Sequence, residues 1–191
     1  MASRLLCERL KAADTGWLPE YAGNVRRRAM PHDVLAGLFG DDAVLVPVPG
    51  SRPATVGVWA AERLAVALLG VGLAHCVWRA LYRRYPVRKS ATAVNTQRPT
   101  VRQHYESFAV ATVPCAADPV AAPRLILIDD VITKGRTIFA AALRLYEVFP
   151  HADIRAFALV RTLGFLPEVS RSIEPCQGVV RWAGGDTRRE P

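Results

Sequence analysis

The sequence predicts an α/β domain with a mainly parallel β-sheet flanked by helices. Three apolar segments rich in β-branched residues are typical of buried strands: AVLVPVP (43–49), RLILIDD (124–130) and IRAFALV (154–160). Between them, apolar residues recur at helical spacing over residues 56–68 and 138–149. Strands that alternate with helices in this way are typical of parallel sheets, which bind ligands beyond the carboxyl ends of their strands.

The N-terminal part is expected to form helices and then the first strand. Residues 1–40 predict one or two short helices joined by polar turns, with the basic triplet Arg26–Arg28 between them. The strand at 43–49 ends in two prolines and a glycine, which predicts a tight loop. Ser51 is expected to cap the next helix, and Gly70 is expected to end it.

Residues 79–105 differ from the rest of the chain because they carry many basic residues and no acidic one. The basic residues are Arg79, Arg83, Arg84, Arg88, Lys89, Arg98 and Arg102. Like charges at this density repel one another unless an anion bridges them. We predict a long, partly mobile loop, of which residues 83–104 are exposed and either ill-packed or a two-stranded excursion that lies over the loop Asp129–Thr137. Its histidine, His104, is the one histidine of the chain that we select for a functional test.

The remaining segments predict smaller elements. FAVATV (108–113) is typical of a strand, and residues 116–123 of a proline- and alanine-rich connection. GVVRW (178–182) predicts a small strand. Residues 184–191 predict a frayed tail.

Length and composition bound the class of protein. A chain of 191 residues has room for one domain of ordinary size, whose core we place at about 41–162. The content of 51% apolar and 22% charged residues excludes intrinsic disorder as the main state. The net charge is +8, and all but three of the 25 basic residues are arginine. Arginine can reflect genome bias, but it also suits bidentate contact with phosphate, so an anionic partner is expected.

Cysteine usage and the N-terminus predict a reduced, cytoplasmic protein without a membrane partner. The four cysteines form no Cys-x-x-Cys pair and have no histidine at ligand spacing, so neither a zinc finger nor a disulfide framework is expected. The start MASRLLCERLK lacks the unbroken apolar core of a signal peptide. The apolar runs are too short to span a bilayer.

The segment LILIDDVITKGRT (125–137) carries the chemistry. A buried strand delivers Asp129 and Asp130 to the edge of the sheet, and a short loop with two threonines and Gly135 then opens a helix. Glycine allows close approach of the backbone, while free N–H groups, the helix dipole and the hydroxyls favour a phosphate. Two carboxylates would repel that phosphate unless they bind another part of the ligand, such as sugar hydroxyls or Mg²⁺. A ligand with a phosphate beside a diol is a ribose 5-phosphate.

Paired acids after an apolar strand are not specific to a phosphate site. They occur in phosphoacceptor receiver domains, where a further acidic acceptor lies on a later strand, and they also cap helices. Here the pair is central, and Asp153 precedes its strand rather than following it. Neither a receiver domain nor a helix cap accounts for the T-x-G-x-T that follows the pair.

The segment resembles the phosphoribosyl-pyrophosphate (PRPP) signature of type I phosphoribosyltransferases: four apolar residues, two acids, two apolar residues and T-x-G-x-T. The order of the pieces agrees over roughly 43–161, since PVPGSR (47–52) lies where that family has its pyrophosphate loop and 79–105 where it has its mobile catalytic loop. The V-P-V-P strand end, and Gln97 and Arg102 as a Q-x-x-x-x-R-type segment, look most like ComF-like phosphoribosyltransferases. The Cys-rich zinc-binding start of that branch is absent, and VGVWAAER stands in place of its R-G-F-N-Q run.

The resemblance implies one domain over 1–191 with a small hood, built from 1–40, from 163–184 or from both, and it suggests a homodimer. It implies that Asp129 and Asp130 hold the ribose hydroxyls and stabilise developing positive charge. The loop for the 5-phosphate would consist of Thr133, Lys134, Gly135, Arg136 and Thr137. The pyrophosphate loop would consist of Pro49, Gly50, Ser51 and Arg52. The leaving group would be neutralised from the mobile loop by Arg88 and Lys89.

Two functions are open to a chain of this kind. The first is an enzyme that moves ribose 5-phosphate from PRPP to a nitrogen nucleophile and releases pyrophosphate, with Mg²⁺ held mainly by PRPP and Asp129 and Asp130 as its candidate protein ligands. The second is a non-catalytic protein of the same fold that senses PRPP or binds nucleic acid, since ComF-like proteins are linked to DNA uptake. The net charge, the triplet Arg26–Arg28 and three tyrosines among the loop arginines favour single-stranded DNA as the partner. These are Tyr82, Tyr85 and Tyr105.

The sequence does not name the acceptor, but it disfavours one class. In phosphoribosyltransferases that use 6-oxopurines, an aspartate usually follows the second acid by three positions and accepts a proton from the purine ring. Thr133 has this place here, and a threonine hydroxyl cannot act as a base near neutral pH. An orotate-like anionic base, an amine or no acceptor at all is therefore favoured over hypoxanthine and guanine.

Overall fold

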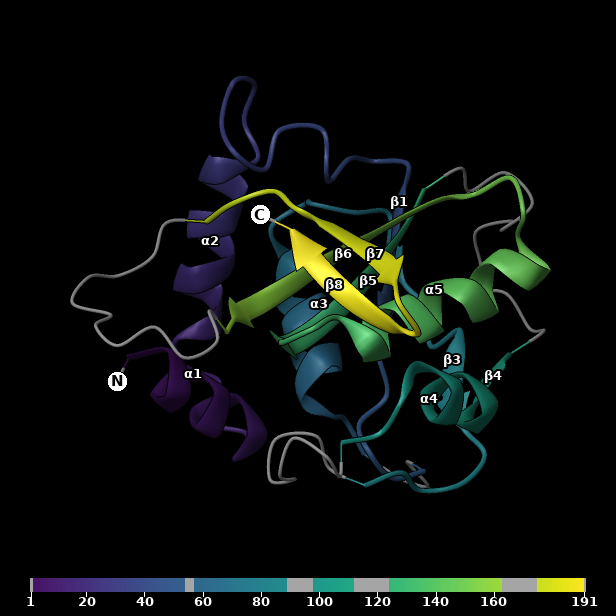
Figure 1. The fold of residues 1–191 in the computed structure, drawn as a ribbon. Coiled ribbons are helices and arrows are strands. Elements are labelled where there is room, and N and C mark those ends of the chain that lie inside the picture. The colour runs from purple at the N-terminus through teal and green to yellow at the C-terminus, as the bar shows by residue number, and fades with distance from the viewer. Residues whose placement is uncertain (1, 54–56, 89–97, 112–123, 163–174, 191) are drawn as a thin grey trace.

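The computed structural model describes residues 2–53, 57–88, 98–111, 124–162 and 175–190. Figure 1 shows helices on both sides of a central sheet. The helices are α1 (Ala2–Lys11), α2 (Leu18–Arg28), α3 (Ala60–Gly70), α4 (Val101–Ser107) and α5 (Arg136–Val148). The strands are β1 (Ala43–Pro47), β2 (Cys76–Val77), β3 (Leu81–Arg83), β4 (Phe108–Val110), β5 (Arg124–Ile132), β6 (Asp153–Arg161), β7 (Val179–Ala183) and β8 (Asp186–Glu190).

The central sheet has four parallel strands in the order β2-β1-β5-β6. β1 lies beside β5 with Pro47 opposite Ile128, and β5 lies beside β6 with Asp129 opposite Ala158. The three strands predicted at 43–49, 124–130 and 154–160 are therefore neighbours in one sheet. The prediction of an α/β domain with a parallel sheet flanked by helices is confirmed.

Alternation along the central strands divides the core into two halves. Leu45, Ile126 and Ile128 belong to one cluster with α1, α2 and α3, whereas Val46 and Leu127 belong to a second cluster with α5, β3 and β4. Successive side chains of a strand point to opposite faces of the sheet, so two buried faces require uninterrupted apolar runs. These layers fix the loops that leave the carboxyl ends of β1 and β5.

Two boundaries near the N-terminus differ from the predictions. The basic triplet Arg26–Arg28 forms the last turn of α2 rather than a link between helices, which places positive charge where the helix dipole is negative. The helix predicted to begin near Ser51 begins at Ala60, with Trp59 as its N-cap. Gly57 has φ +101°, a left-handed conformation that interrupts any helix before that point.

The described parts of the basic segment, 79–88 and 98–105, are more ordered than a loop, because they contain β3 and most of α4. β3 pairs antiparallel with β4 in a separate two-stranded sheet, so the strand predicted at 108–113 lies outside the main sheet. This pairing joins the two ends of the basic segment. Thr100 accepts from the backbone N–H of Gln103, whose side chain accepts from the N–H of Thr100, and this capping box begins α4. Arg83 and His104, predicted to be exposed, are 4% and 3% exposed.

The C-terminal segment also differs in part. The small strand predicted at 178–182 is confirmed as β7. The prediction of a frayed tail over 184–191 is wrong, because Asp186–Glu190 forms β8 and pairs antiparallel with β7 along its length. In Figure 1 this hairpin, drawn in yellow, crosses in front of the sheet near the first turn of α5. The connection predicted at 116–123 lies outside the described residues.

The cysteines and the helix lengths bear on two further expectations. Cys76 is disulfide-bonded, whereas Cys7 and Cys176 are free, so the expectation of a fully reduced chain is wrong at one position. Within the described ranges, no helix has the length and apolar character needed to cross a membrane.

Candidate functional site

Two groups of site residues predicted from the sequence, Asp129–Thr137 and Pro49–Arg52, lie at the carboxyl edge of the sheet. Because β1 and β5 are parallel neighbours, their carboxyl ends lie at the same edge of the sheet: the chain leaves β1 after Pro47 and β5 after Ile132, and the N–H of Val48 donates to the carbonyl of Ile128 over 2.8 Å. This is the edge at which α/β sheets bind ligands. The pair Asp129–Asp130 and the loop Pro49–Arg52 therefore lie on adjacent strands.

The two carboxylates of the pair have different partners, and they also interact with each other. Asp129 accepts the backbone N–H of Asp130 over 2.9 Å, and the Asp130 carboxylate forms an ion pair with Lys11 of α1 at 2.9 Å. Burial and the neighbouring Asp130 raise the pKa of Asp129 above its ordinary range. Burial and the charge of Asp130 therefore oppose ionisation of Asp129, and a cation or hydroxyl donor that arrives there would favour its charged form.

The N-terminal helix α1 forms one wall of this site. Lys11 reaches the carboxylate of Asp130, and the thiol of Cys7 lies 4.0 Å from the carbonyl oxygen of the same residue. Burial, and then the charge of Asp130, raises the pKa of Cys7 to about 11, so the thiol is neutral and unreactive at neutral pH. Two residues of α1 thus contact the second acid of the pair.

The loop 133–137 has the backbone geometry of an anion-binding turn. Gly135 is the N-cap of α5 and has φ +83°, and the helix begins at Arg136. Within the described part of the chain, no backbone acceptor is bonded to the N–H groups of residues 133–136. Free N–H groups at a helix N-terminus carry partial positive charge and bind anions.

The β7–β8 hairpin lies directly against this loop. Asp186 accepts two hydrogen bonds from Arg136, at 2.5 and 2.6 Å, and forms an ion pair with Lys134 at 3.1 Å. These contacts, the guanidinium of Arg136 first, hold the pKa of Asp186 well below its ordinary range. The β7–β8 hairpin therefore presents a carboxylate to two cations of the loop 133–137.

Gly135→Ala is expected to destabilise the protein through a defined contact. A Cβ at this position would lie 2.7 Å from Cγ1 of Val180 and would also meet a positive φ, so we expect a loss of about 2 kcal/mol or more in the free energy of unfolding. Gly37→Ala is the matched control, because Gly37 has φ +71° with no heavy atom within 4 Å of its added Cβ. Urea denaturation measures both. Equal losses in the two variants would contradict the contact, and Val180→Ala should recover part of the Gly135→Ala loss.

The loop 49–52 is anchored from the basic segment. Arg83 donates from Nε to the carbonyl of Gly50, and the N–H of Val87 donates to the carbonyl of Ser51 over 2.8 Å. Pro49 is buried, whereas Gly50 and Arg52 are exposed at the sheet edge. Residues predicted for pyrophosphate are thus held on one side by β1 and on the other by residues 83–87.

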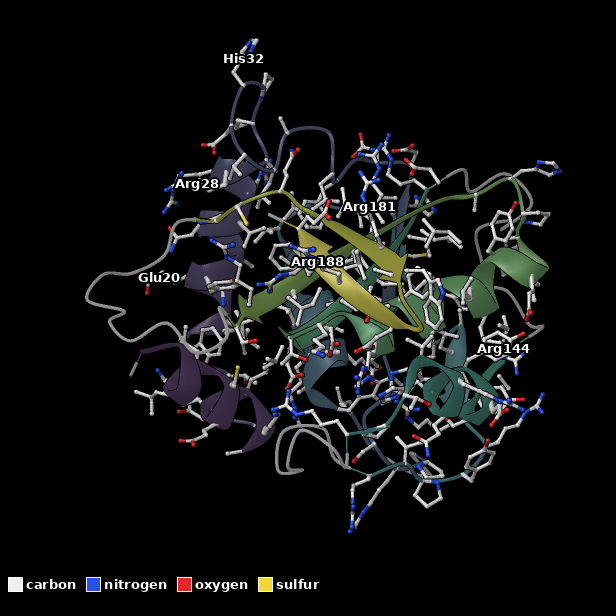
Figure 2. All side chains as sticks on the ribbon, in the orientation of Figure 1. Glu20, Arg28, His32, Arg144, Arg181 and Arg188 are labelled. Atoms are coloured by element: carbon white, nitrogen blue, oxygen red, sulfur yellow. The ribbon has the colours of Figure 1, made fainter. Side chains whose placement is uncertain are left out.

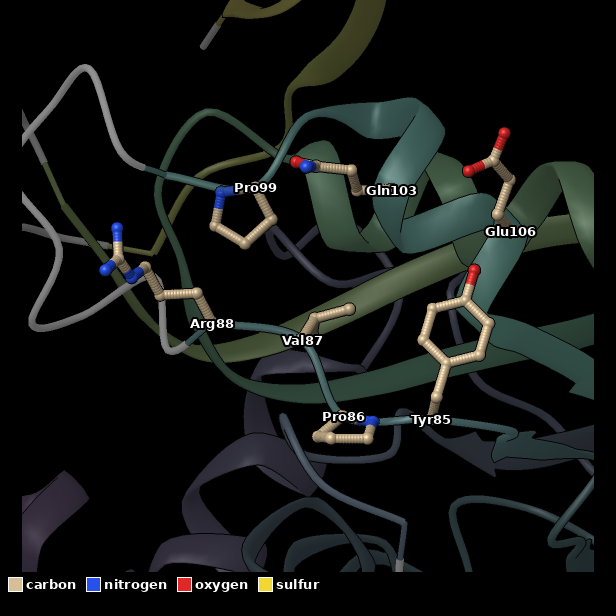
Figure 3. A pocket seen from close by; sticks show the side chains of 7 residues that line it. All are labelled: Tyr85, Pro86, Val87, Arg88, Pro99, Gln103 and Glu106. Atoms are coloured by element: carbon tan, nitrogen blue, oxygen red, sulfur yellow. The ribbon is translucent and has the colours of Figure 1, made fainter.

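The basic segment lies beside both loops. Arg136 donates to the carbonyls of Arg98 and Pro99, at 3.4 and 3.1 Å. These contacts place the C-terminal part of the basic segment beside the loop 133–137. Between its two ends is an open cavity of about 360 Å³, lined by Arg88 of the predicted site and by Gln103 and Glu106 of α4 (Figure 3). Lys89 lies outside the described residues. The prediction that this segment lies over the loop after β5 agrees with the Arg136 contacts.

The acidic pair provides the candidate metal ligands of the site. Within the described ranges, no group of three or more His, Cys, Asp and Glu side chains is arranged to hold a metal ion. Asp129 and Asp130 alone offer hard oxygen ligands, which suit Mg²⁺ when a substrate supplies the remaining oxygens.

Three site residues could not be found from the sequence. Lys11, Arg83 and Asp186 contact the loops through links that span tens of residues along the chain. The sequence places Arg83 among exposed basic residues and Asp186 in a frayed tail. Of the aromatic residues in the predicted hood, Trp17 packs against Tyr21 and Trp182 stacks on Phe139.

Comparisons with known proteins assign no family to these residues. A scan against protein-family models finds no matching family, and a search of curated proteins finds no matching protein.

Proposed function

We propose that the chain is a magnesium-dependent phosphoribosyltransferase that transfers ribose 5-phosphate from PRPP to a nitrogen nucleophile and releases pyrophosphate. One observation carries the proposal. Asp129 and Asp130 lie near the carboxyl end of the parallel strand β5, which is followed by a turn at Gly135 and by α5, while the loop Pro49–Arg52 follows the adjacent strand β1. This arrangement offers carboxylates for a diol between two places for phosphate groups.

In this proposal the two loops hold PRPP at its two ends. The N–H groups of residues 133–137 bind the 5-phosphate, and Asp129 and Asp130 accept hydrogen bonds from the ribose hydroxyls. The bond from the sugar carbon to the pyrophosphate oxygen breaks as the bond to the acceptor nitrogen forms. The positive charge that develops on the sugar is stabilised by the nearby carboxylates, and the acceptor loses its proton.

The leaving group carries negative charge to the other loop. Backbone groups of Gly50 and Ser51 and the guanidinium of Arg52 bind the departing pyrophosphate, with Arg88 and Lys89 supplied by the basic segment. Mg²⁺, when bound with the substrate, would neutralise pyrophosphate charge and would be held by Asp129 and Asp130. Positioning and electrostatics account for the chemistry in this scheme.

Pyrophosphate release from PRPP tests the proposal, with an acceptor panel of orotate, ammonia, hypoxanthine and guanine. We expect Mg²⁺-dependent release with an anionic base or an amine, and none with the two 6-oxopurines. The reason is that Thr133 cannot accept the proton that a 6-oxopurine must lose. If the protein neither releases pyrophosphate nor binds PRPP under any condition, the proposed enzyme activity is contradicted. Efficient formation of purine nucleotides would contradict only the proposed acceptor class.

A second candidate, binding of single-stranded DNA, is supported by exposed aromatic and basic side chains. Tyr82 and Tyr85 are 50% and 44% exposed. Arg181 and Arg188 are opposite one another on the hairpin and exposed, as Figure 2 shows for the labelled pair. Tyr105 does not fit this role, because its hydroxyl donates to Glu147 and Arg144 lies over its ring.

Salt dependence separates the two candidates. Binding of a single-stranded oligonucleotide that weakens steeply from low to moderate salt, and that Tyr82→Ala reduces, would favour the nucleic-acid function. Weak binding with a flat salt dependence would remove it.

A further inference from the structure

A buried polar network connects the two candidate phosphate loops. Arg83 of β3 donates to the carbonyl of Gly50, to Oγ of Ser107 and, over 3.2 Å, to Nδ1 of His104. Nε2 of His104 then lies 3.4 Å from Oγ1 of Thr137, in the first turn of α5. The network therefore runs from the pyrophosphate loop to the 5-phosphate loop through two side chains that are less than 5% exposed.

The chemistry of Arg83 fixes the tautomer of His104. A guanidinium has only donors, so Nδ1 of His104 must accept its hydrogen bond, and the ring proton then lies on Nε2. Nε2 consequently donates to Oγ1 of Thr137. Burial, and then the charges of Arg83 and Arg136, lowers the pKa of His104 to about 4, which keeps the ring neutral at physiological pH.

The hydrogen bond from His104 constrains the hydroxyl of Thr137. One lone pair of Oγ1 is occupied by the imidazole, so the hydroxyl proton points away from His104. Thr137 lies at the start of α5 with the free N–H groups of the loop, where its proton can reach the same anion. A fixed donor binds an anion better than a rotating one, because its orientation costs no entropy on binding.

Arg83 brings a buried charge to the other loop. In the described part of the chain its polar partners are a carbonyl, a hydroxyl and a neutral imidazole, and its guanidinium lies 4.0 Å from the ring centroid of Phe108. Burial lowers the pKa of Arg83 to about 10, and the charge of Asp129, with which it forms no ion pair, offsets this effect only in part. Burial of a cation without a carboxylate costs stability, which an anion bound at Gly50–Arg52 would offset.

We propose that Arg83 and His104 are a pair of positioning residues that bridges the two phosphate loops, with His104 orienting the Thr137 hydroxyl toward the 5-phosphate and Arg83 anchoring Gly50 beside the pyrophosphate. The proposal rests on the proposed function and adds two residues that do not touch the reacting atoms. In this proposal the affinity of both loops for phosphorylated ligands depends on the buried side chains of Arg83 and His104.

Calorimetric titration with ribose 5-phosphate tests the role of His104. His104→Phe keeps a ring of similar size without a donor, and we expect its affinity for ribose 5-phosphate to fall about fivefold to tenfold. His104→Gln can accept from Arg83 and donate to Thr137, and it should stay within about twofold of the unsubstituted protein. If His104 served only to fill space, His104→Gln would lose more ribose 5-phosphate affinity than His104→Phe. His151→Phe, at an exposed position, is the control and should change nothing.

A double-mutant cycle tests whether His104 acts through Thr137. Thr137→Val should weaken ribose 5-phosphate binding by a similar factor, and the double variant His104→Phe/Thr137→Val should bind no more weakly than Thr137→Val alone. Additive losses would overturn the route through the hydroxyl. Arg83→Met, which replaces a buried cation by an apolar chain of similar length, should lower pyrophosphate affinity at least tenfold without lowering thermal stability.

Nitrogen NMR of the imidazole gives a readout that needs no variant. The unsubstituted protein should show His104 neutral at pH 7 with its proton on Nε2, and a proton on Nδ1 would overturn the inference. If ribose 5-phosphate binds and neither His104→Phe nor Arg83→Met changes phosphate or pyrophosphate affinity, the inference fails while the proposed function stands. If the unsubstituted protein binds neither ligand nor PRPP, both fail.

Discussion

Asp129→Asn is expected to abolish pyrophosphate release from PRPP while leaving the fold at least as stable as before. Asparagine has the shape of aspartate, and its Oδ1 can still accept the backbone N–H of Asp130. It cannot carry the negative charge that would stabilise an oxocarbenium-like sugar. Removal of one electrostatic group from a preorganised site typically costs a hundredfold or more in rate, so we expect a fall of at least about a hundredfold.

The effect on stability follows from the environment of the carboxyl group. Burial and the adjacent Asp130 raise the pKa of Asp129 in the folded state above its value in the unfolded chain. Ionisation of such a group lowers the free energy of unfolding. This loss of stability is absent below the pKa of the unfolded chain, and it grows as pH rises toward and through the pKa of the folded protein. Asp129→Asn removes this cost, and its stability advantage should be larger at pH 7 than at pH 4.

Urea denaturation and the pyrophosphate assay on the same preparations measure both effects. Asp41→Asn is the control, since Asp41 is exposed at the opposite end of β1 and precedes that strand. We expect this variant to keep full release and ordinary stability. Full release by Asp129→Asn would contradict the proposed role of the carboxylate, and a loss of both stability and release would assign it a structural role.

The central strands could be predicted from the sequence because their signals are local. AVLVPVP and RLILIDD are apolar almost throughout, which is what burial on both faces of a sheet requires. The loops that matter follow directly from these strands, so their meeting at one edge could also be predicted. Parallel pairing of β1 with β5 brings 49–52 and 129–137 together without any further information.

The elements that could not be predicted depend on contacts between distant residues. β8 has the sequence DTRRE, with no apolar alternation, and it is held in place by Asp186 through Arg136 and Lys134, about 50 residues earlier. α4 had a local signal, since Thr100 and Gln103 match the capping-box pattern, but the surrounding arginines favoured a loop. Burial of Arg83 could not be predicted at all, because its partners are a carbonyl and side chains from other elements.

The pH dependence of stability is expected to carry the signature of His104. Its pKa is about 4 in the folded protein and about 6.5 in an unfolded chain, so the unfolded state binds more protons between these values. The stabilisation from the neutral ring is therefore complete above pH 6.5 and is lost as pH falls toward 4. Arg83 of β3 and Arg136 of α5 face the ring and oppose its protonation, whereas the nearby hydroxyls of Ser107 and Thr137 do not titrate.

Comparison with His104→Gln isolates this contribution, because other groups titrate alike in the two proteins. From pH 7 to pH 4 the unsubstituted protein should lose roughly 3 kcal/mol more free energy of unfolding than the variant, as a shift of two to three pKa units implies. Urea denaturation at pH 7, 6, 5 and 4 measures the difference. If the free energy of unfolding depended on pH in the same way in both proteins, the ring would be solvated and free to protonate. That outcome would contradict the buried hydrogen bonds of His104 with Arg83 and Thr137. A difference confined to the range below pH 6.5 would instead be the proton linkage that a buried, neutral imidazole between two arginines requires.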